Sequence, residues 1–349
     1  MSDSPYLSIV AVSRNDGHGG HLLERMEYFI DSLYEQCNRY RLDTELIIVE
    51  WNPPENKKRL FEALKWPCDT GFLKTKIIVV PHEVHSTFKH SERLPLFQMI
   101  GKNVGIRRAK GEFILATNID ILFSDELMEY LAEKRLHNDV LYRADRMDSA
   151  SPFNSWFKFF CKQSSSVILD FCKINIIRVN KKYGTYTAGS ISDRLKVYTR
   201  HHIQKLKDHY TGRIPFYGAI HTNGCGDFTL MSRSLWMKFC GYPELQIFSW
   251  NIDSVLLIAA YHFGIKEIDL RPPKNTFHME HGSGSGWTPG KGEEMLFKRI
   301  EEQKIPVLSW EDCISISRMW SRVGKLNHVV CFNEPGWGLE GYELECISI

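Results

Sequence analysis

Strand-like and helix-like segments alternate along the first 150 residues, and this alternation constrains the fold more than any other feature of the sequence. Strands are predicted at the short apolar runs 6–13, 44–51, 74–81, 111–117 and 139–145. Helices are predicted between them, at 21–37, 58–66, 95–109 and 124–136. Strands that are separated by helices pair in parallel through right-handed crossovers. The pattern therefore predicts an α/β fold in which helices flank a mostly parallel, Rossmann-like central sheet.

The alternation breaks after residue 148. Residues 149–215 are rich in Ser, Lys, Tyr and His, and we interpret them as an inserted, lid-like segment. Order returns with a strand, helix and turn predicted over 227–244, a buried helix over 252–264 and a strand over 266–271. C-terminal helices are predicted over residues 292–320. We expect one domain with four parts, at residues 1–148, 149–215, 216–290 and 291–349.

The composition favours a soluble enzyme over a nucleic-acid-binding, disulfide-rich or membrane-spanning protein. Hydrophobic residues make up 43% and charged residues 25% of the 349 positions, as in an ordinary soluble enzyme. Lys plus Arg is 44 and Asp plus Glu is 42, so the net charge of +2 gives no case for a nucleic-acid partner. The nine cysteines include no CxxC pair, which disfavours a disulfide framework. Since no signal peptide or membrane-spanning run stands out, we expect a cytoplasmic protein, peripheral to a membrane at most.

Two oxygen-bearing side chains, Asn118 and Asp120, follow the predicted strand at 111–117. Ligands of parallel sheets bind at the carboxyl ends of the strands. At such a place an amide and a carboxylate suit Mg²⁺ or Mn²⁺ that carries a diphosphate. An Asx-turn that ends the strand explains the same two residues. The residues alone leave both interpretations open.

The segment KNVGIRRAKGEFILATNID, residues 102–120, resembles the GT-A fold of nucleotide-sugar glycosyltransferases, particularly the inverting, family-2-like group. The positions that match the helix signature of that group are Asn103, Gly105, Ala109, Gly111 and Glu112. The resemblance covers roughly residues 1–135 and implies that a DxD-type motif ends the fourth strand. Asn118 stands where the first Asp of that motif is usual, which leaves Asp120 as the main acidic metal ligand.

A second stretch, residues 222–244 followed by 249–264, looks like the acceptor-side half of galactosyltransferase-like GT-A enzymes. That resemblance implies that Asp253 is the base that deprotonates the acceptor hydroxyl. It also assigns acceptor binding to Trp250, Asn251 and Asp227. An acid in the first turn of a helix stabilises the helix dipole as well, so the residues alone keep that alternative for Asp253 open.

The resemblance implies further ligands. GT-A enzymes often supply a late histidine to the metal, and His281 is the first choice here, with His278 second. The Gly/Ser loop at 281–286 would bring N–H groups to a diphosphate, or would be a solvent loop. The residues assigned to the donor nucleotide are Ser13, Arg14, Asp16, Glu50, Asn103, Arg107 and Asn118. For Lys89, His90 and Arg93, a solvated loop is favoured over contact with the diphosphate.

Together these features imply a metal-dependent glycosyltransferase that uses Mn²⁺ or Mg²⁺ and acts with inversion. The expected partners are a nucleotide-diphosphate sugar donor and a carbohydrate acceptor. One alternative is a nucleotidyltransferase on a Rossmann-like sheet. The other is an inactive carbohydrate-binding relative, because Asn118 and Asn251 replace acids that are common at their positions. A dinucleotide enzyme is disfavoured, since no GxGxxG follows the first strand.

Overall fold

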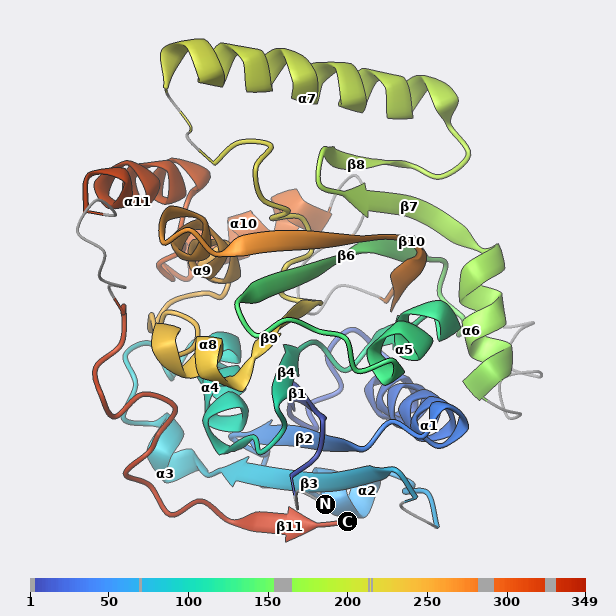
Figure 1. Cartoon of the computed structure of the whole chain (residues 1–349). Helices are drawn as coiled ribbons and strands as arrows, with labels where there is room; N and C mark the ends of the chain where they lie inside the picture. The colour runs from blue at the N-terminus through green and yellow to red at the C-terminus, as the bar shows by residue number, and fades with distance from the viewer. Residues whose placement is uncertain are drawn as a thin grey trace.

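A single sheet runs through the computed structural model, which describes residues 4–68, 71–153, 165–212, 214, 216–281, 292–323 and 331–349. Its strand order is β11-β3-β2-β1-β4-β9-β6-β10-β5, and β7 and β8 extend it beside β6. Helices lie on both sides of this sheet (Figure 1). The fold is therefore mixed α/β, with a large central sheet flanked by helices.

The N-terminal strands form the parallel run that the sequence predicts. They are β1 (Leu7–Ser13), β2 (Thr44–Trp51), β3 (Leu73–Val80) and β4 (Phe113–Ala116). Their order is β3-β2-β1-β4, and every pair in this run is parallel. The connecting helices are α1 (Leu22–Tyr40), α2 (Leu60–Ala63), α3 (His82–His85) and α4 (Gln98–Arg108).

Side chains of β1 point alternately to the two faces of the sheet, and each set packs into a separate hydrophobic core. Leu7, Ile9 and Ala11 pack into the core that contains the apolar face of α1. Val10 and Val12 pack into the opposite core, which contains α4. Successive strand residues point to opposite faces, so a continuously apolar strand is the pattern expected when both faces are covered.

Beyond β4 the strands pair in both directions, so the sheet as a whole is mixed. The elements here are β5 (Ile121–Phe123), α5 (Asp125–Ala132), β6 (Val140–Ser149), β9 (Thr229–Ser232) and β10 (Lys266–Met279). β9 pairs antiparallel with β4 and with β6. β10 pairs parallel with β6 and antiparallel with β5. The fifth predicted strand, β6, is thus separated from β4 by a strand that comes much later in the chain.

The segment that we interpreted as an insertion contains a hairpin and two helices among its described residues. They are α6 (Ser165–Ile174), β7 (Ile176–Lys181), β8 (Gly184–Thr187) and α7 (Ile191–Thr211). β7 pairs antiparallel with β6, so the hairpin continues the central sheet. Figure 1 shows α7 beyond β8, at the outer limit of the molecule and away from the central layers.

The C-terminal part supplies helices, as predicted, and one strand that was not predicted. The helices are α8 (Arg233–Phe239), α9 (Ile252–His262), α10 (Gly292–Glu302) and α11 (Trp310–Val323). The chain then ends in β11 (Cys346–Ser348), which pairs antiparallel with β3 at the sheet edge. Among the described residues, none of the helices combines the length and the apolar character that crossing a membrane requires.

Candidate active site

A cavity of about 650 Å³ opens where β1, β4 and β10 end and α9 begins. Most of the residues that the sequence analysis selected line it. They are Asp16, Asn118, Asp120, Asp227, Trp250, Asn251, Asp253, His278 and His281. These residues come from distant parts of the chain. Asn118, Asp120 and His278 lie near the carboxyl ends of strands, as the rule for α/β sheets predicts. Asp227 precedes β9, and Trp250, Asn251 and Asp253 lie at the start of α9.

Asp120 and the two late histidines form one cluster in this cavity. The Oδ2 atom of Asp120 lies 3.1 Å from Nε2 of His281 and 3.9 Å from Nε2 of His278. The three potential ligand atoms all lie within 4.8 Å of one another. Pairing of β10 with β5 places His278 opposite Ile121, the residue after Asp120. The sheet register therefore fixes the approach of the histidines to the carboxylate.

Arg25 of α1 reaches the same carboxylate. Its fully buried guanidinium donates from Nη1 to Oδ2 of Asp120 at 2.8 Å. The other nitrogens of Arg25 donate to the carbonyls of His18 and Gly20, at 2.7 and 3.2 Å. Burial alone would raise the pKa of Asp120, but the hydrogen bond to His281 and the charges of His278, His281 and Arg25 hold it well below its usual range. Asp120 is thus ionised across the neutral pH range.

The donor set of this cluster fits a divalent transition-metal ion. Carboxylates and imidazoles are both ligands of divalent first-row metal ions, and three protein ligands leave positions for diphosphate oxygens. Among the residues that the structure describes, the buried Nδ1 of His278 has no hydrogen-bond partner, and it lies 3.6 Å from Oδ1 of Asp148. A carboxylate behind a histidine orients that histidine in many metal sites. Asp120, His278 and His281 are therefore the residues that would hold the ion.

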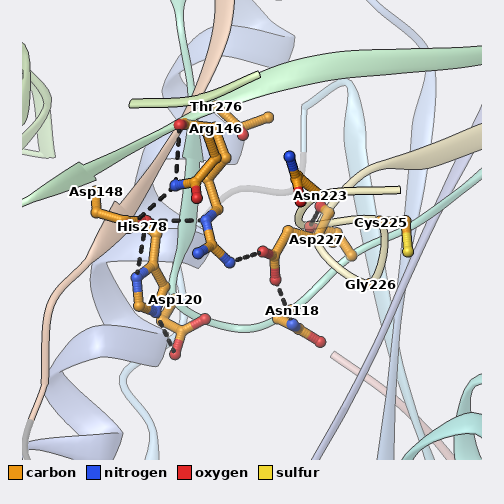
Figure 2. Close-up of polar contacts among 12 residues, drawn as sticks. Asn118, Asp120, Arg146, Asp148, Asn223, Cys225, Gly226, Asp227, Thr276 and His278 are labelled. Atoms are coloured by element: carbon orange, nitrogen blue, oxygen red, sulfur yellow. Dashed lines mark hydrogen bonds and ion pairs between the residues drawn. The ribbon is translucent and has the colours of Figure 1, made fainter. Parts of the chain in front are cut away.

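A chain of polar contacts continues from this cluster along the cavity wall (Figure 2). Asn118 donates to Oδ1 of Asp227, whose Oδ2 pairs with Nη1 of Arg146. Nε of Arg146 pairs with Asp148 at 2.8 Å. Gln98 donates to the amide oxygen of Asn118 at 2.8 Å. The partners of Asn118 and Asp120 thus lie far away in the sequence, which favours the functional interpretation over an Asx-turn.

Asp253 occupies the first turn of α9, as predicted, and is partly exposed to the cavity. Its Oδ1 accepts the backbone N–H of Ser254 at 2.9 Å. Desolvation of the carboxyl by the surrounding protein raises the pKa of Asp253, although a contact with Cys225 and the charge of Lys102 oppose that shift. A Cβ on Gly226 would come within 2.9 Å of Oδ2 of Asp253, so only glycine fits beside this carboxyl without a shift.

Lys102 of α4 is a site residue that the sequence analysis did not select. Its side chain is fully buried, and Nζ donates to the carbonyl of Gly226 at 2.6 Å. Burial lowers its pKa to about 8, while the charges of Asp227 and Asp253 oppose the shift. Arg25 and Arg146 were also not selected. Arg146 directly follows the strand predicted at 139–145, so the strand-end rule would have found it.

The residues assigned to the donor nucleotide divide into two groups. Asp16 lines the cavity and accepts the N–H of His18 at 3.0 Å. Nη1 of Arg14 lies 3.7 Å from Asp16, and the hydroxyl of Ser13 contacts the sulfur of Met26 at 3.4 Å. The strand end after β1 therefore reaches the cavity through Asp16, with Ser13 and Arg14 behind it.

Glu50, Asn103 and Arg107 bind structural partners away from the cavity. Glu50 accepts hydrogen bonds from Arg59 at 3.0 Å and from the N–H of Leu60 at 2.8 Å. Asn103 exchanges hydrogen bonds with the backbone of Tyr242, both at 2.8 Å. Arg107 lies over the ring of Trp337 at 4.8 Å and pairs with Glu340. These contacts give all three side chains a structural role outside the cavity.

The residues that the sequence analysis assigned to the acceptor, Trp250, Asn251 and Asp227, all line the cavity. The ring of Trp250 meets the edge of Phe297 with 5.5 Å between centroids. Asn251 donates to the carbonyl of Leu308 at 2.9 Å. Arg93 also lines the cavity, whereas Lys89 is exposed. Residues 282–286 of the predicted Gly/Ser loop lie outside the described residues.

No protein-family model matches the chain, and no curated protein matches it. One matching solved structure is a crystal structure of GalNAc-T7 with UDP, GalNAc and Mn²⁺, with a TM-score of 0.43 and 12% sequence identity. The match covers 86% of this chain and 50% of that chain, so this chain spans about half the length of the matched protein. The geometry of the cavity, rather than this distant match, is the basis for assigning a function.

Proposed function

We propose that this chain is a metal-dependent glycosyltransferase, which moves a sugar from a nucleotide-diphosphate donor to a hydroxyl of a glycan with inversion. One observation carries the proposal: a single cavity holds the Asp120–His278–His281 cluster and, apart from it, the carboxyl of Asp253. Inverting displacement at an anomeric carbon needs a stabilised leaving group and a base on the acceptor. The cluster and Asp253 are suited to these two tasks.

The leaving diphosphate belongs beside the cluster. Mn²⁺ or Mg²⁺ held by Asp120, His281 and His278 would supply Lewis-acid stabilisation of the charge on the departing oxygens. Arg25 adds a fixed positive charge at the same carboxylate. Asp16 and Asn118 line the cavity on the side of β1 and β4 and suit hydrogen bonds to the ribose or the base. These are the contacts that we propose for the donor, with Ser13 and Arg14 supporting them.

The acceptor belongs beside Asp253. A base works best when its pKa approaches the working pH, and the surroundings of Asp253 shift its pKa in that direction. Trp250 brings an aromatic side chain to the cavity, and Asn251 lies next to it at the start of α9. Asp227 is held in place by Asn118 and Arg146. We propose that these three residues orient the acceptor hydroxyl toward Asp253.

The products of the reaction test this function. The purified protein is incubated with UDP-, GDP- and dTDP-linked sugars plus Mn²⁺, and the nucleotides are separated by ion exchange. The proposal predicts release of a nucleoside diphosphate that stops when EDTA is added. Pyrophosphate release from a nucleoside triphosphate would identify a nucleotidyltransferase instead. Absence of release from every donor, with binding of a glycan retained, would identify an inactive carbohydrate-binding relative.

A further inference from the structure

Helix α7, Ile191–Thr211, turns its polar side toward the protein. The side chains that face the rest of the molecule are buried or half-buried and recur every three or four residues: Asp193, Val197, His201, Gln204 and Asp208. Oδ2 of Asp193 accepts the N–H of Thr187 at 2.7 Å. The ring of His201 stacks on Tyr217 with 5.1 Å between centroids. The helix is therefore attached to the hairpin and to the following loop by its polar face.

The apolar side of α7 faces solvent. The exposed fractions are 76% for Ile191, 58% for Leu195, 48% for Tyr198, 49% for Ile203, 59% for Leu206 and 84% for Tyr210. At 3.6 residues per turn these positions share the side opposite the packed face. A surface helix of a globular protein normally turns such a stripe toward the core. This helix does the reverse, although the exposed Ser192, Thr199, His202 and His209 lie among the apolar side chains. Contiguous apolar side chains on an exposed face mark interaction surfaces.

Basic side chains border the exposed stripe on both sides. Arg194 and Lys205 lie along one edge, and Lys196, Arg200 and Lys207 lie along the other, all of them exposed. The only two acidic residues of the helix, Asp193 and Asp208, belong to the packed face. The outward surface of α7 thus combines apolar side chains with positive charge. Figure 1 shows that this helix lies at the outer limit of the molecule, where a flat surface can contact its whole length.

We propose that α7 docks the protein onto an anionic lipid bilayer. The helix would lie in the plane of the interface, with Leu195 and Leu206 below the headgroups and the basic borders against the phosphates. A second copy of the chain fits this surface poorly, because two such faces would bring like charges together. The inference is independent of the proposed glycosyl transfer, since it rests on a helix outside the cavity.

Vesicle binding tests the inference. The full chain is sedimented with vesicles of phosphatidylcholine alone, or of phosphatidylcholine with about one third phosphatidylglycerol. The wild type should bind the anionic vesicles, and binding should weaken as salt is added, because screening reduces the attraction. Leu195→Glu combined with Leu206→Glu should lower the vesicle affinity by at least about tenfold. Ile174→Glu, at an 81% exposed apolar position of α6, is the matched control and should bind as the wild type does.

Circular dichroism of each variant checks that the total helix content is unchanged, and gel filtration of the same samples reports self-association. The inference is overturned if the wild type ignores anionic vesicles, or if the α7 variants and the α6 control bind equally well. It is also overturned if the wild type is a dimer that the α7 substitutions separate, because the stripe would then be an interface between copies.

Discussion

Two carboxyl groups of the same cavity have pKa values shifted in opposite directions. Asp120 is surrounded by Arg25, His278 and His281, and its pKa lies below the usual range. The carboxyl of Asp253 is closely surrounded by protein, which raises its pKa above the usual value with only partial compensation from the charge of Lys102. Environments that separate the pKa values of two carboxyl groups are how one site assigns them different tasks. At the scale of residues, this contrast supports the separate tasks that we propose for Asp120 as a metal ligand and for Asp253 as the base.

Replacing Asp253 with Asn tests the base. The substitution keeps the shape of the side chain and removes its basicity, so turnover should fall by roughly 10²–10⁴ while donor affinity is retained. In the wild type, activity should fall as the pH drops through the raised pKa of Asp253, above the value of about 3.9 for an ordinary Asp. If Asp253 only stabilises the helix dipole, the variant will instead lose about 0.3–1 kcal/mol of stability and keep its turnover.

Lys102 gives a prediction on stability against pH. In the folded protein the pKa of Lys102 is about 8, below its usual value. At a pH between these two pKa values, the unfolded chain therefore binds more protons than the folded protein does. The unfolding free energy of the wild type should therefore rise, relative to Lys102→Met, by up to about 3 kcal/mol between pH 8 and pH 10.4. Urea unfolding of both proteins across this range measures the difference. Parallel stability curves would mean that Lys102 has an ordinary pKa in the fold.

At the scale of elements, the strand-end rule located the cavity but did not identify the partner of each side chain. The strands predicted at 44–51 and 6–13 match β2 and β1 closely, because continuous apolar runs are local signals. The resemblance assigned Asn103 of α4 to the donor, yet its amide joins α4 to the turn at Tyr242. A motif identifies a residue that matters, but its partners depend on the packing of elements that are distant in sequence.

Asn103→Ala tests that structural role. The substitution leaves the buried N–H of Tyr242 without its acceptor, which should cost about 1–3 kcal/mol of stability. Donor affinity of the folded variant should match the wild type, since Asn103 lies away from the cavity. Chemical unfolding and nucleotide titration on one preparation measure both quantities. Unchanged stability with weakened donor binding would restore the assignment that the sequence resemblance implied.

At the scale of the whole molecule, the order of the strands is what the sequence did not reveal. The alternation of strands and helices in the sequence predicted the parallel run of β1 to β4, because each strand–helix–strand crossover is a local feature of the chain. β9 enters between β4 and β6 from more than 75 residues later in the chain, and no local pattern encodes that pairing. The contact between Arg25 and Asp120, which are 95 residues apart, was missed for the same reason. The positions of the strand-end side chains could be predicted from the sequence, whereas the contact between Arg25 and Asp120 could not.

The central claim is that Asp120, His278 and His281 hold a divalent ion that carries the diphosphate of the donor. Calorimetric titration of UDP and GDP, with and without Mn²⁺, tests it most directly on the wild type, Asp120→Asn, His281→Ala and His278→Ala. We expect Mn²⁺-dependent binding of one nucleotide to the wild type and its loss in Asp120→Asn. His281→Ala should weaken binding more than His278→Ala, because Nε2 of His281 lies closer to Oδ2 of Asp120, at 3.1 against 3.9 Å. Nucleotide binding that ignores Mn²⁺, or that survives unchanged in Asp120→Asn, would contradict the account.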